Sequence, residues 1–321
     1  MGDFAAWVFL FLVFPGIVFS TLLGLTLSWV DRKVTALVQM RRGPPASQPF
    51  WDVVKLLGKE VVVPEQSWAA GFITLPFVAF SAAALAGTLV WLALIGSPVT
   101  TVGDLIVVLY LLAIPSLAVI LGGTASGNPL GAVGASRDMK LLMAYELPFV
   151  IALLVAVFQK RPVGAAEASA TTLSLQGLLA FQDAAGSIIS RPSGVLAFLV
   201  ALLCAHAKLG FVPFDLAEAE TEIGEGAVIE YSGAALGFLK LTHALLLSVL
   251  PALLVLVFWG GMGEGAGGVA GFIGKVLLIV VLFVLIKNTN PRVRIDQALR
   301  FFWGPATVVA LLALILAQLG W

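Results

Sequence analysis

Long apolar runs, separated by shorter polar stretches, dominate this chain. A helix needs about 20 residues to cross the hydrocarbon core of a membrane, and eight runs are close to that length or longer. Tryptophans fall near the ends of several runs, as is typical of the aromatic belts at membrane interfaces. The pattern therefore predicts eight transmembrane helices, at 4–29, 70–96, 103–122, 141–158, 194–211, 234–259, 269–287 and 303–320.

Basic residues are distributed unevenly among the segments between these spans. Most of them fall in the loops at 30–69, 123–140, 212–233 and 288–302 or at the span ends beside them. The other side has only Lys160, Arg161, Arg191 and, near the start of a span, Lys275. Cytoplasmic loops of membrane proteins carry an excess of lysine and arginine. We therefore expect one membrane domain over residues 1–321, in the cytoplasmic (inner) membrane, with both termini outside.

The first cytoplasmic loop contains a second kind of pattern. Between residues 50 and 61 the apolar side chains recur at helical spacing, while Asp52, Lys55, Lys59 and Glu60 occupy other faces. An amphipathic helix of this kind lies on a membrane surface, either as a simple anchor or also as a docking element.

Composition supports a membrane protein and excludes several other classes. The chain is 60% hydrophobic and only 11% charged, against roughly 25% charged residues in soluble domains. Its net charge of zero gives no indication of nucleic-acid binding. The single Cys204 excludes an internal disulfide and a multi-cysteine cluster, and two histidines make a zinc site unexpected. We predict an all-α polytopic membrane protein that binds no metal or cofactor itself.

One acidic stretch stands out, because residues 208–233 contain six of the eighteen acids in the chain. If a helix begins after Pro213, Asp215, Glu218, Glu222 and Glu225 share one face, while Glu220 points elsewhere. Carboxyl groups that lie this close to one another disfavour joint ionisation, so some of their pKa values are raised and they titrate as a coupled set. A proton-handling site requires such groups. The alternative is an ordinary helix start, where acids act as caps.

Ionisable residues inside the predicted spans are few, and each is a functional candidate because charge is costly at membrane depth. Glu146 lies in span four, where the alternative is a side chain that reaches the headgroups. Lys240 and His243 lie one turn apart in span six, and Lys240 needs a carboxylate partner such as Glu146 or the acidic stretch. The expected proton or coupling path comprises Glu146, Asp215, Glu218, Glu220, Glu222, Glu225, Glu230, Lys240 and His243.

Two other classes of function fit parts of this pattern. His206 and His243, on adjacent spans, are a candidate pair of haem ligands, as in a cytochrome. Charges near the middle of the membrane also fit a stand-alone ion or solute carrier, although no pair of broken helices in matching halves supports one.

Several polar motifs resemble one known family over almost the whole chain and in the same order. They include Asp31-Arg-Lys-Val34, Arg41-Arg-Gly-Pro44, Tyr145-Glu-Leu-Pro148, Pro213-Phe-Asp-Leu-Ala-Glu-Ala-Glu220 and Glu230-Tyr-Ser-Gly233. These resemble the H-type subunit of respiratory complex I and its relatives in membrane-bound [NiFe] hydrogenases. The resemblance implies a non-catalytic, eight-helix subunit of an ion-translocating oxidoreductase.

The resemblance also implies partners. Peripheral hydrogenase-like large and small subunits would carry the iron-sulfur clusters and a nickel-iron centre, and antiporter-like and small membrane subunits would complete the membrane arm. We expect the redox arm to dock on Arg32, Lys33, Arg41, Arg42, Lys208, Arg292, Arg294 and Asp296.

Two departures from the complex I pattern favour the hydrogenase-like branch. Lys208 and Phe211 replace an acid and an arginine of complex I members, and the loop around Pro44-Pro45 is shorter. Both changes fall where complex I builds its quinone chamber, so bound quinone is not expected. The alternative is a quinone-site subunit of an NADH:quinone oxidoreductase.

Overall fold

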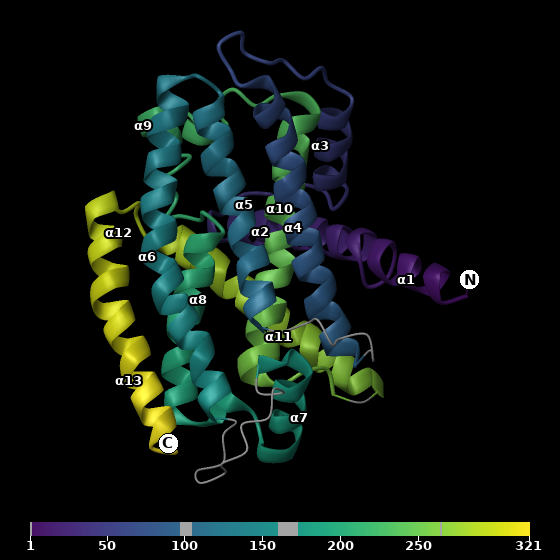
Figure 1. Ribbon diagram of the computed structural model, residues 1–321, viewed down its shortest axis with the longest axis vertical. Coiled ribbons are helices and arrows are strands. Elements are labelled where there is room, and N and C mark those ends of the chain that lie inside the picture. The colour runs from purple at the N-terminus through teal and green to yellow at the C-terminus, as the bar shows by residue number, and fades with distance from the viewer. Residues whose placement is uncertain (1, 97–104, 160–172, 264) are drawn as a thin grey trace.

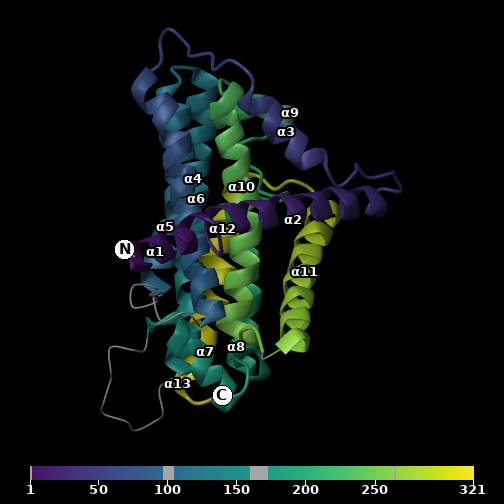
Figure 2. The ribbon, with the colours of Figure 1, turned by 90° about the vertical axis from the view of Figure 1, so that its right-hand side faces the viewer.

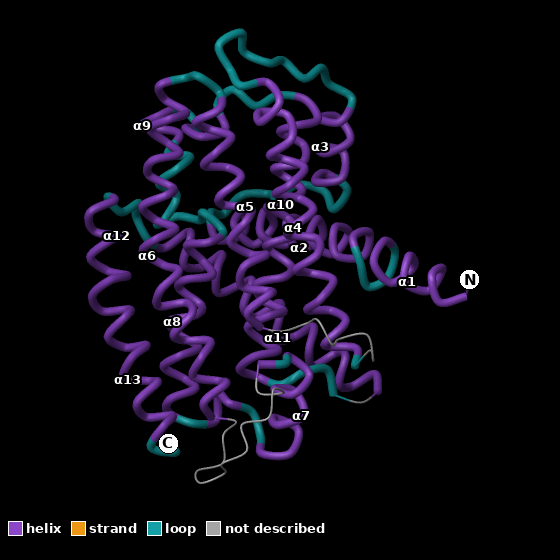
Figure 3. The backbone as a smooth tube through the Cα atoms, in the orientation of Figure 1, coloured by secondary structure: helices purple, strands orange, loops and turns teal. Residues whose placement is uncertain are grey.

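The regular elements of this protein are helices throughout the described ranges, 2–96, 105–159, 173–263 and 265–321 of the computed structural model (Figure 3). Their bounds are α1 Gly2–Leu12, α2 Ile17–Val38, α3 Gln48–Leu57, α4 Ala69–Ile95, α5 Leu105–Ala125, α6 Pro129–Gln159, α7 Leu175–Ala185, α8 Pro192–Lys208, α9 Glu220–Ile223, α10 Gly233–Leu254, α11 Gly265–Thr289, α12 Ile295–Phe301 and α13 Thr307–Gln318. Short 3₁₀ turns lie at Ile188–Ser190 and Gly226–Val228, and π-helical turns at Val255–Trp259 and Phe302–Ala306.

Seven helical segments of the described chain are long and apolar enough to cross a membrane. They are Trp7–Val38, Ala69–Ile95, Leu105–Ala125, Pro129–Gln159, Gly233–Trp259, Gly265–Thr289 and Ile295–Gln318. The remaining predicted span, at 194–211, corresponds to α8, which is apolar but only 17 residues long. The protein is therefore the expected all-α membrane protein, with one helix shorter than the other seven segments.

Three polar segments are more helical than their composition suggested. The helix α2 continues to Val38 and includes the Asp31-Arg-Lys33 motif, and α6 begins at Pro129, twelve residues before the predicted span. At the C-terminus, α12, a π-helical turn and α13 run on without a break from Ile295. Hydropathy finds the apolar part of such a helix, but not the polar turns that extend it beyond the apolar run.

The helix α10 forms the centre of the molecule. It packs against α2, α3 and α4, and it also contacts α8 and α11. In Figure 1, α4, α5, α6, α8 and α10 run roughly side by side, and α12 and α13 lie along one edge. The pair α1 and α2 instead crosses this bundle at a steep angle, as Figure 2 shows.

The amphipathic segment forms α3, which ends at Leu57 and is shorter than the predicted 50–61. Val53 packs with Leu25 and Leu241, whereas Trp51 and Val54 are exposed. One edge of the apolar face therefore anchors α3 on the bundle. The rest remains available for lipid or a partner.

Candidate functional site

The acidic stretch is a folded loop and not the long helix expected from the spacing of its carboxylates. Between α8 and α10 the only α-helical residues are Glu220–Ile223, followed by one 3₁₀ turn. Gly226 has a φ of 46°, and a Cβ there would meet the carbonyl of Ala217. This glycine lets the chain fold back on itself, so the predicted common face of Asp215, Glu218, Glu222 and Glu225 does not form.

Three of the acids have separate partners. Asp215 pairs with Arg292 at 2.6 Å, and the carboxylate of Glu222 accepts a bond from Arg137 at 2.5 Å. The side-chain amide of Asn128 donates to Glu230 at 2.6 Å. These contacts tie the loop to α6, to the α5–α6 connection and to the segment before α12. Each of these three acids therefore has a partner on another element.

A polar cavity of about 110 Å³ lies between this loop and helices α5, α6, α8 and α10. Since a water molecule needs about 10–15 Å³ of such space, the cavity has room for several waters. Its ionisable lining residues are Asp138, Lys208, Asp215, Glu218 and His243. Acids and bases from four elements thus meet around one water-sized space.

At this cavity, the buried Lys208 forms an ion pair with the part-buried Glu146. The Lys208 ammonium lies 3.0 Å from a carboxylate oxygen of Glu146 and donates to the carbonyl of Leu112 at 3.3 Å. Its side chain is completely buried, next to the rings of Tyr145 and Phe149. The expectation that Lys208 docks a partner was therefore wrong, because no part of its side chain reaches the surface.

Lys240 is not the partner of Glu146. It is exposed and forms no ion pair within the described part of the chain, although its positive charge lies near Asp52 and Glu218. One turn further along α10, His243 lines the cavity and is accessible from it. Glu218 and Lys208 line the same cavity, and Lys208 connects it to Glu146.

The two histidines are poorly arranged as haem ligands. The ring of Phe211 contacts both, at 5.7 Å from His206 and 5.3 Å from His243 between ring centres. Nε2 of His206 is already hydrogen-bonded at 2.8 Å to the carbonyl of Val212. A phenyl ring thus occupies the space between the imidazoles.

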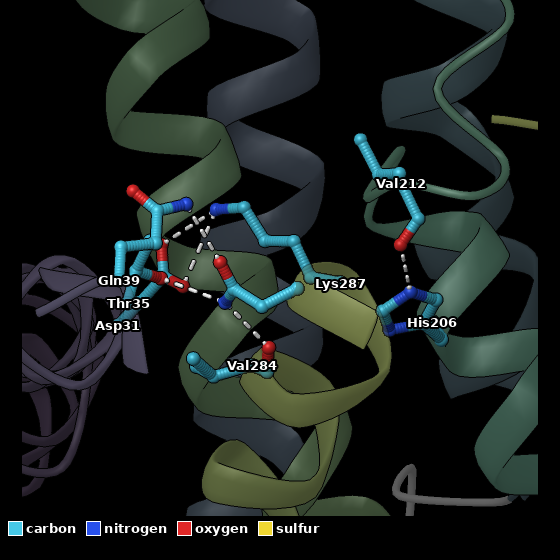
Figure 4. Close-up of polar contacts among 8 residues, drawn as sticks. Asp31, Thr35, Gln39, His206, Val212, Val284 and Lys287 are labelled. Carbon is cyan, nitrogen blue, oxygen red and sulfur yellow. Dashed lines mark hydrogen bonds and ion pairs between the residues drawn. The ribbon is translucent and has the colours of Figure 1, made fainter. Parts of the chain in front are cut away.

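Two further acids were missed from the sequence, one at this cavity and one outside it. Asp138 lines the cavity from α6, seven residues before Tyr145, a spacing that places both on one helix face. Asp31, outside this cavity, is 8% exposed and accepts two bonds from Lys287, at 3.1 and 3.3 Å, beside the Thr35 and Gln39 side chains (Figure 4). Both acids stand in charged motifs outside the predicted spans, so hydropathy did not mark them as charges inside a helix.

The residues expected to dock a redox arm have different environments. Arg32 pairs with Asp52 at 2.7 Å; burial alone would raise the pKa of Asp52, but bonds from Arg32 and Gln48 outweigh burial and lower it. Lys33 is half-buried, and Arg292 is occupied by Asp215. The exposed members of the set are Arg41, Arg42, Arg294 and Asp296.

Glu218 has a pKa suited to proton exchange. More than a third of the residue is accessible at the cavity mouth, yet the protein around its carboxyl excludes most bulk water. This burial, with the negative charges of Asp215, Asp138 and Glu225, raises the pKa of Glu218 to about 7. The residue can therefore accept or release a proton at neutral pH.

We expect a carboxyl infrared band from Glu218 that disappears with a midpoint near pH 7 and is missing in Glu218→Gln. Since the folded pKa exceeds the ordinary value of 4.5, Glu218 contributes stability at low pH that is lost as the pH rises towards 7. The control is Glu222→Gln, because Arg137 lowers the pKa of Glu222 and this residue has no such band at pH 6. An unchanged band in Glu218→Gln would refute the assignment.

Comparison with known proteins gives a consistent result. The family model described as NADH dehydrogenase matches residues 10–318. The chain is 34% identical to the H subunit of the NADH-quinone oxidoreductase of Thermomicrobium roseum, covering 92% of this chain and 91% of that protein. It is 33% identical to formate hydrogenlyase subunit 4 of Escherichia coli, over 87% and 89% of the two chains. A chain of the membrane-bound sulfane sulfur reductase, an archaeal respiratory membrane complex, matches with a TM-score of 0.84 at 28% identity, over 99% and 100%.

Proposed function

This chain belongs to the NADH dehydrogenase family, and on that basis we propose that it couples a cytoplasmic redox arm to ion movement in the membrane. Its relatives are subunits of respiratory and hydrogenase-type complexes, so it is a membrane subunit of such an assembly. The observation that supports coupling best is the polar cavity, which joins the partly exposed Glu218 to the buried Lys208–Glu146 pair.

In this proposal, Glu218 is the group that senses the redox arm. A charge change on a docked partner shifts the pKa of Glu218, and a shift of one pKa unit corresponds to about 1.4 kcal/mol. Waters in the cavity then carry the proton between Glu218 and Lys208. Glu146 stabilises the charged form of Lys208, so gain or loss of that proton changes the field inside the membrane. The ion moved further along is a proton or sodium.

Electron transfer belongs to partner subunits in this proposal. The chain has one cysteine, too few to hold an iron-sulfur cluster. The clusters and a nickel-iron centre would lie in hydrogenase-like large and small subunits, docked on exposed cytoplasmic residues such as Arg294 and Asp296. Antiporter-like and small membrane subunits would carry the ions. The direct test measures charge moved per electron in vesicles and is developed in the Discussion.

The proposed orientation places both termini outside the cell membrane. We expect Ser47→Cys, in the exposed α2–α3 connection, to react with an impermeant maleimide only from the cytoplasm. Ala184→Cys, exposed on α7, should react only from outside. The native Cys204 is buried and gives little background. Labelling of both positions from one side would contradict this topology.

A quinone site is the second candidate, favoured by relatives named as the H subunit of NADH-quinone oxidoreductase. The polar cavity of about 110 Å³ is smaller than the roughly 300 Å³ at which ligand pockets begin. Phe211 fills the space beside His206 and His243 with an apolar ring. These observations favour a subunit without quinone.

We therefore expect the purified complex to hold no stoichiometric quinone and to turn over unchanged with quinone-site inhibitors. Extraction followed by chromatography measures the quinone content. Saturable quinone reduction that is lost in Phe211→Ala, but kept in a matched exposed variant such as Phe77→Ala, would establish the second candidate instead.

A further inference from the structure

A second cavity, of about 310 Å³, lies where the C-terminal ends of α2 and α11 meet (Figure 2). It is lined by four cationic side chains, Arg32, Arg41, Arg42 and Lys287, and by one acid, Asp31. The proposed coupling path does not use this cavity. Its excess of positive charge is unusual in a chain whose net charge is zero.

Two of the four cations are neutralised within the protein. Lys287 pairs with Asp31, and Arg32 pairs with Asp52. The side chain of Arg41 donates to the neutral amide oxygen of Gln39, and neither Arg41 nor Arg42 has a carboxylate partner in the described part of the chain. Both arginines are exposed. Their two charges are therefore available to an anion from outside the chain.

The two helices that line this basic cavity also expose apolar side chains. On α2, Leu37 and Val38 are 61% and 41% exposed. On α11, Leu278 and Leu285 are 47% and 39% exposed, on the helix face turned away from Lys287. Both helices belong to segments able to cross a membrane. Basic pockets between the ends of membrane helices are suited to anionic lipid headgroups.

We propose that this cavity binds the phosphate group of an anionic phospholipid. Arg41 and Arg42 contribute the charge-assisted hydrogen bonds to the phosphate oxygens, a geometry that guanidinium groups favour. The acyl chains extend into the membrane beside α2 and α11, which belong to segments apolar enough to cross it. A free phosphate would use the same arginines but gain nothing from the membrane, so a lipid is the better occupant. These arginines then serve a function other than docking a redox arm.

The test uses the intact purified complex, stripped of lipid by detergent exchange and titrated with fluorescent phosphatidylglycerol. We expect Arg41→Gln/Arg42→Gln to weaken the tightest class of binding about 25-fold, since each arginine contributes about fivefold near an anionic lipid. The matched control is Lys140→Gln/Arg300→Gln, which removes two exposed cations, one on α6 and one on α12, that are not expected to dock the redox arm. This control should bind as the unaltered complex does.

Each other result would overturn the proposal. Equal affinity in the Arg41/Arg42 double variant and the control would show that the arginines hold no lipid. Equal binding of fluorescent phosphatidylcholine, which has no net charge, would show that the cavity does not select an anion. Displacement of the lipid by millimolar inorganic phosphate would assign the cavity to a soluble anion. Retained tight binding under that phosphate supports the lipid.

Discussion

Glu146→Leu is expected to destabilise the protein by about 3–5 kcal/mol, because a fully buried charge loses its ionic partner. The change leaves the Lys208 ammonium buried with the carbonyl of Leu112 as its one remaining hydrogen-bond acceptor among the described residues. Equilibrium unfolding in detergent micelles, followed by the loss of far-ultraviolet circular dichroism, measures the difference. The free energy of unfolding of Glu146→Leu should be lower than that of the unaltered protein by this amount.

Two variants make this expectation specific to the pair. Asp52→Asn removes a carboxylate from an ion pair whose side chains are 41% and 31% exposed, so it should cost at most about 1 kcal/mol. The double variant Glu146→Leu/Lys208→Met replaces both charges by apolar groups and should regain most of the loss. If Glu146→Leu cost no more than Asp52→Asn, Lys208 would not depend on Glu146.

The spans of this fold follow from the sequence because an apolar run of about 20 residues has few alternatives in a membrane. The same rule does not predict the polar turns that extend a helix beyond its apolar run. The first turns of α6 contain Arg137 and Asp138 and remain helical because they pack against the loop that precedes α10. Gly134 approaches the backbone of that loop at Ala227. Such packing is tertiary and has no local pattern along the chain.

The sequence predicted which residues belong to the site better than it predicted which of them contact one another. Glu146 was identified as a costly charge inside a span and Glu218 as a member of the acidic stretch; Glu146 pairs with Lys208, and Glu218 lines the same cavity as Lys208. The partner of Glu146 could not be inferred, because Lys208 lies 62 residues away and was assigned to the surface. The prediction that the acids share one helix face was wrong, because the chain folds back at Gly226. Contacts between residues far apart in the sequence depend on how the helices pack, and the spacing of residues along the chain does not encode that packing.

The second large effect concerns ion movement. The Glu146→Leu/Lys208→Met variant keeps a neutral, packed interior, so it should assemble and pass electrons from an artificial donor at a normal rate. Without Lys208 and Glu146, the cavity loses the group that takes the proton from Glu218 towards the membrane interior in this proposal. Ion movement should then be lost although the redox chemistry continues. The matched control is Lys275→Met, which removes another lysine of a membrane helix, one bonded to the carbonyl of Trp259.

The most direct test of coupling is the charge translocated per electron by the complete complex in sealed vesicles, recorded with a membrane-potential dye. For Glu146→Leu/Lys208→Met, the coupling proposal predicts translocation at the level of protein-free vesicles with electron transfer retained, while Lys275→Met translocates normally. An unchanged charge-to-electron ratio in the double variant would contradict the proposal and leave the Lys208–Glu146 pair with a structural role alone.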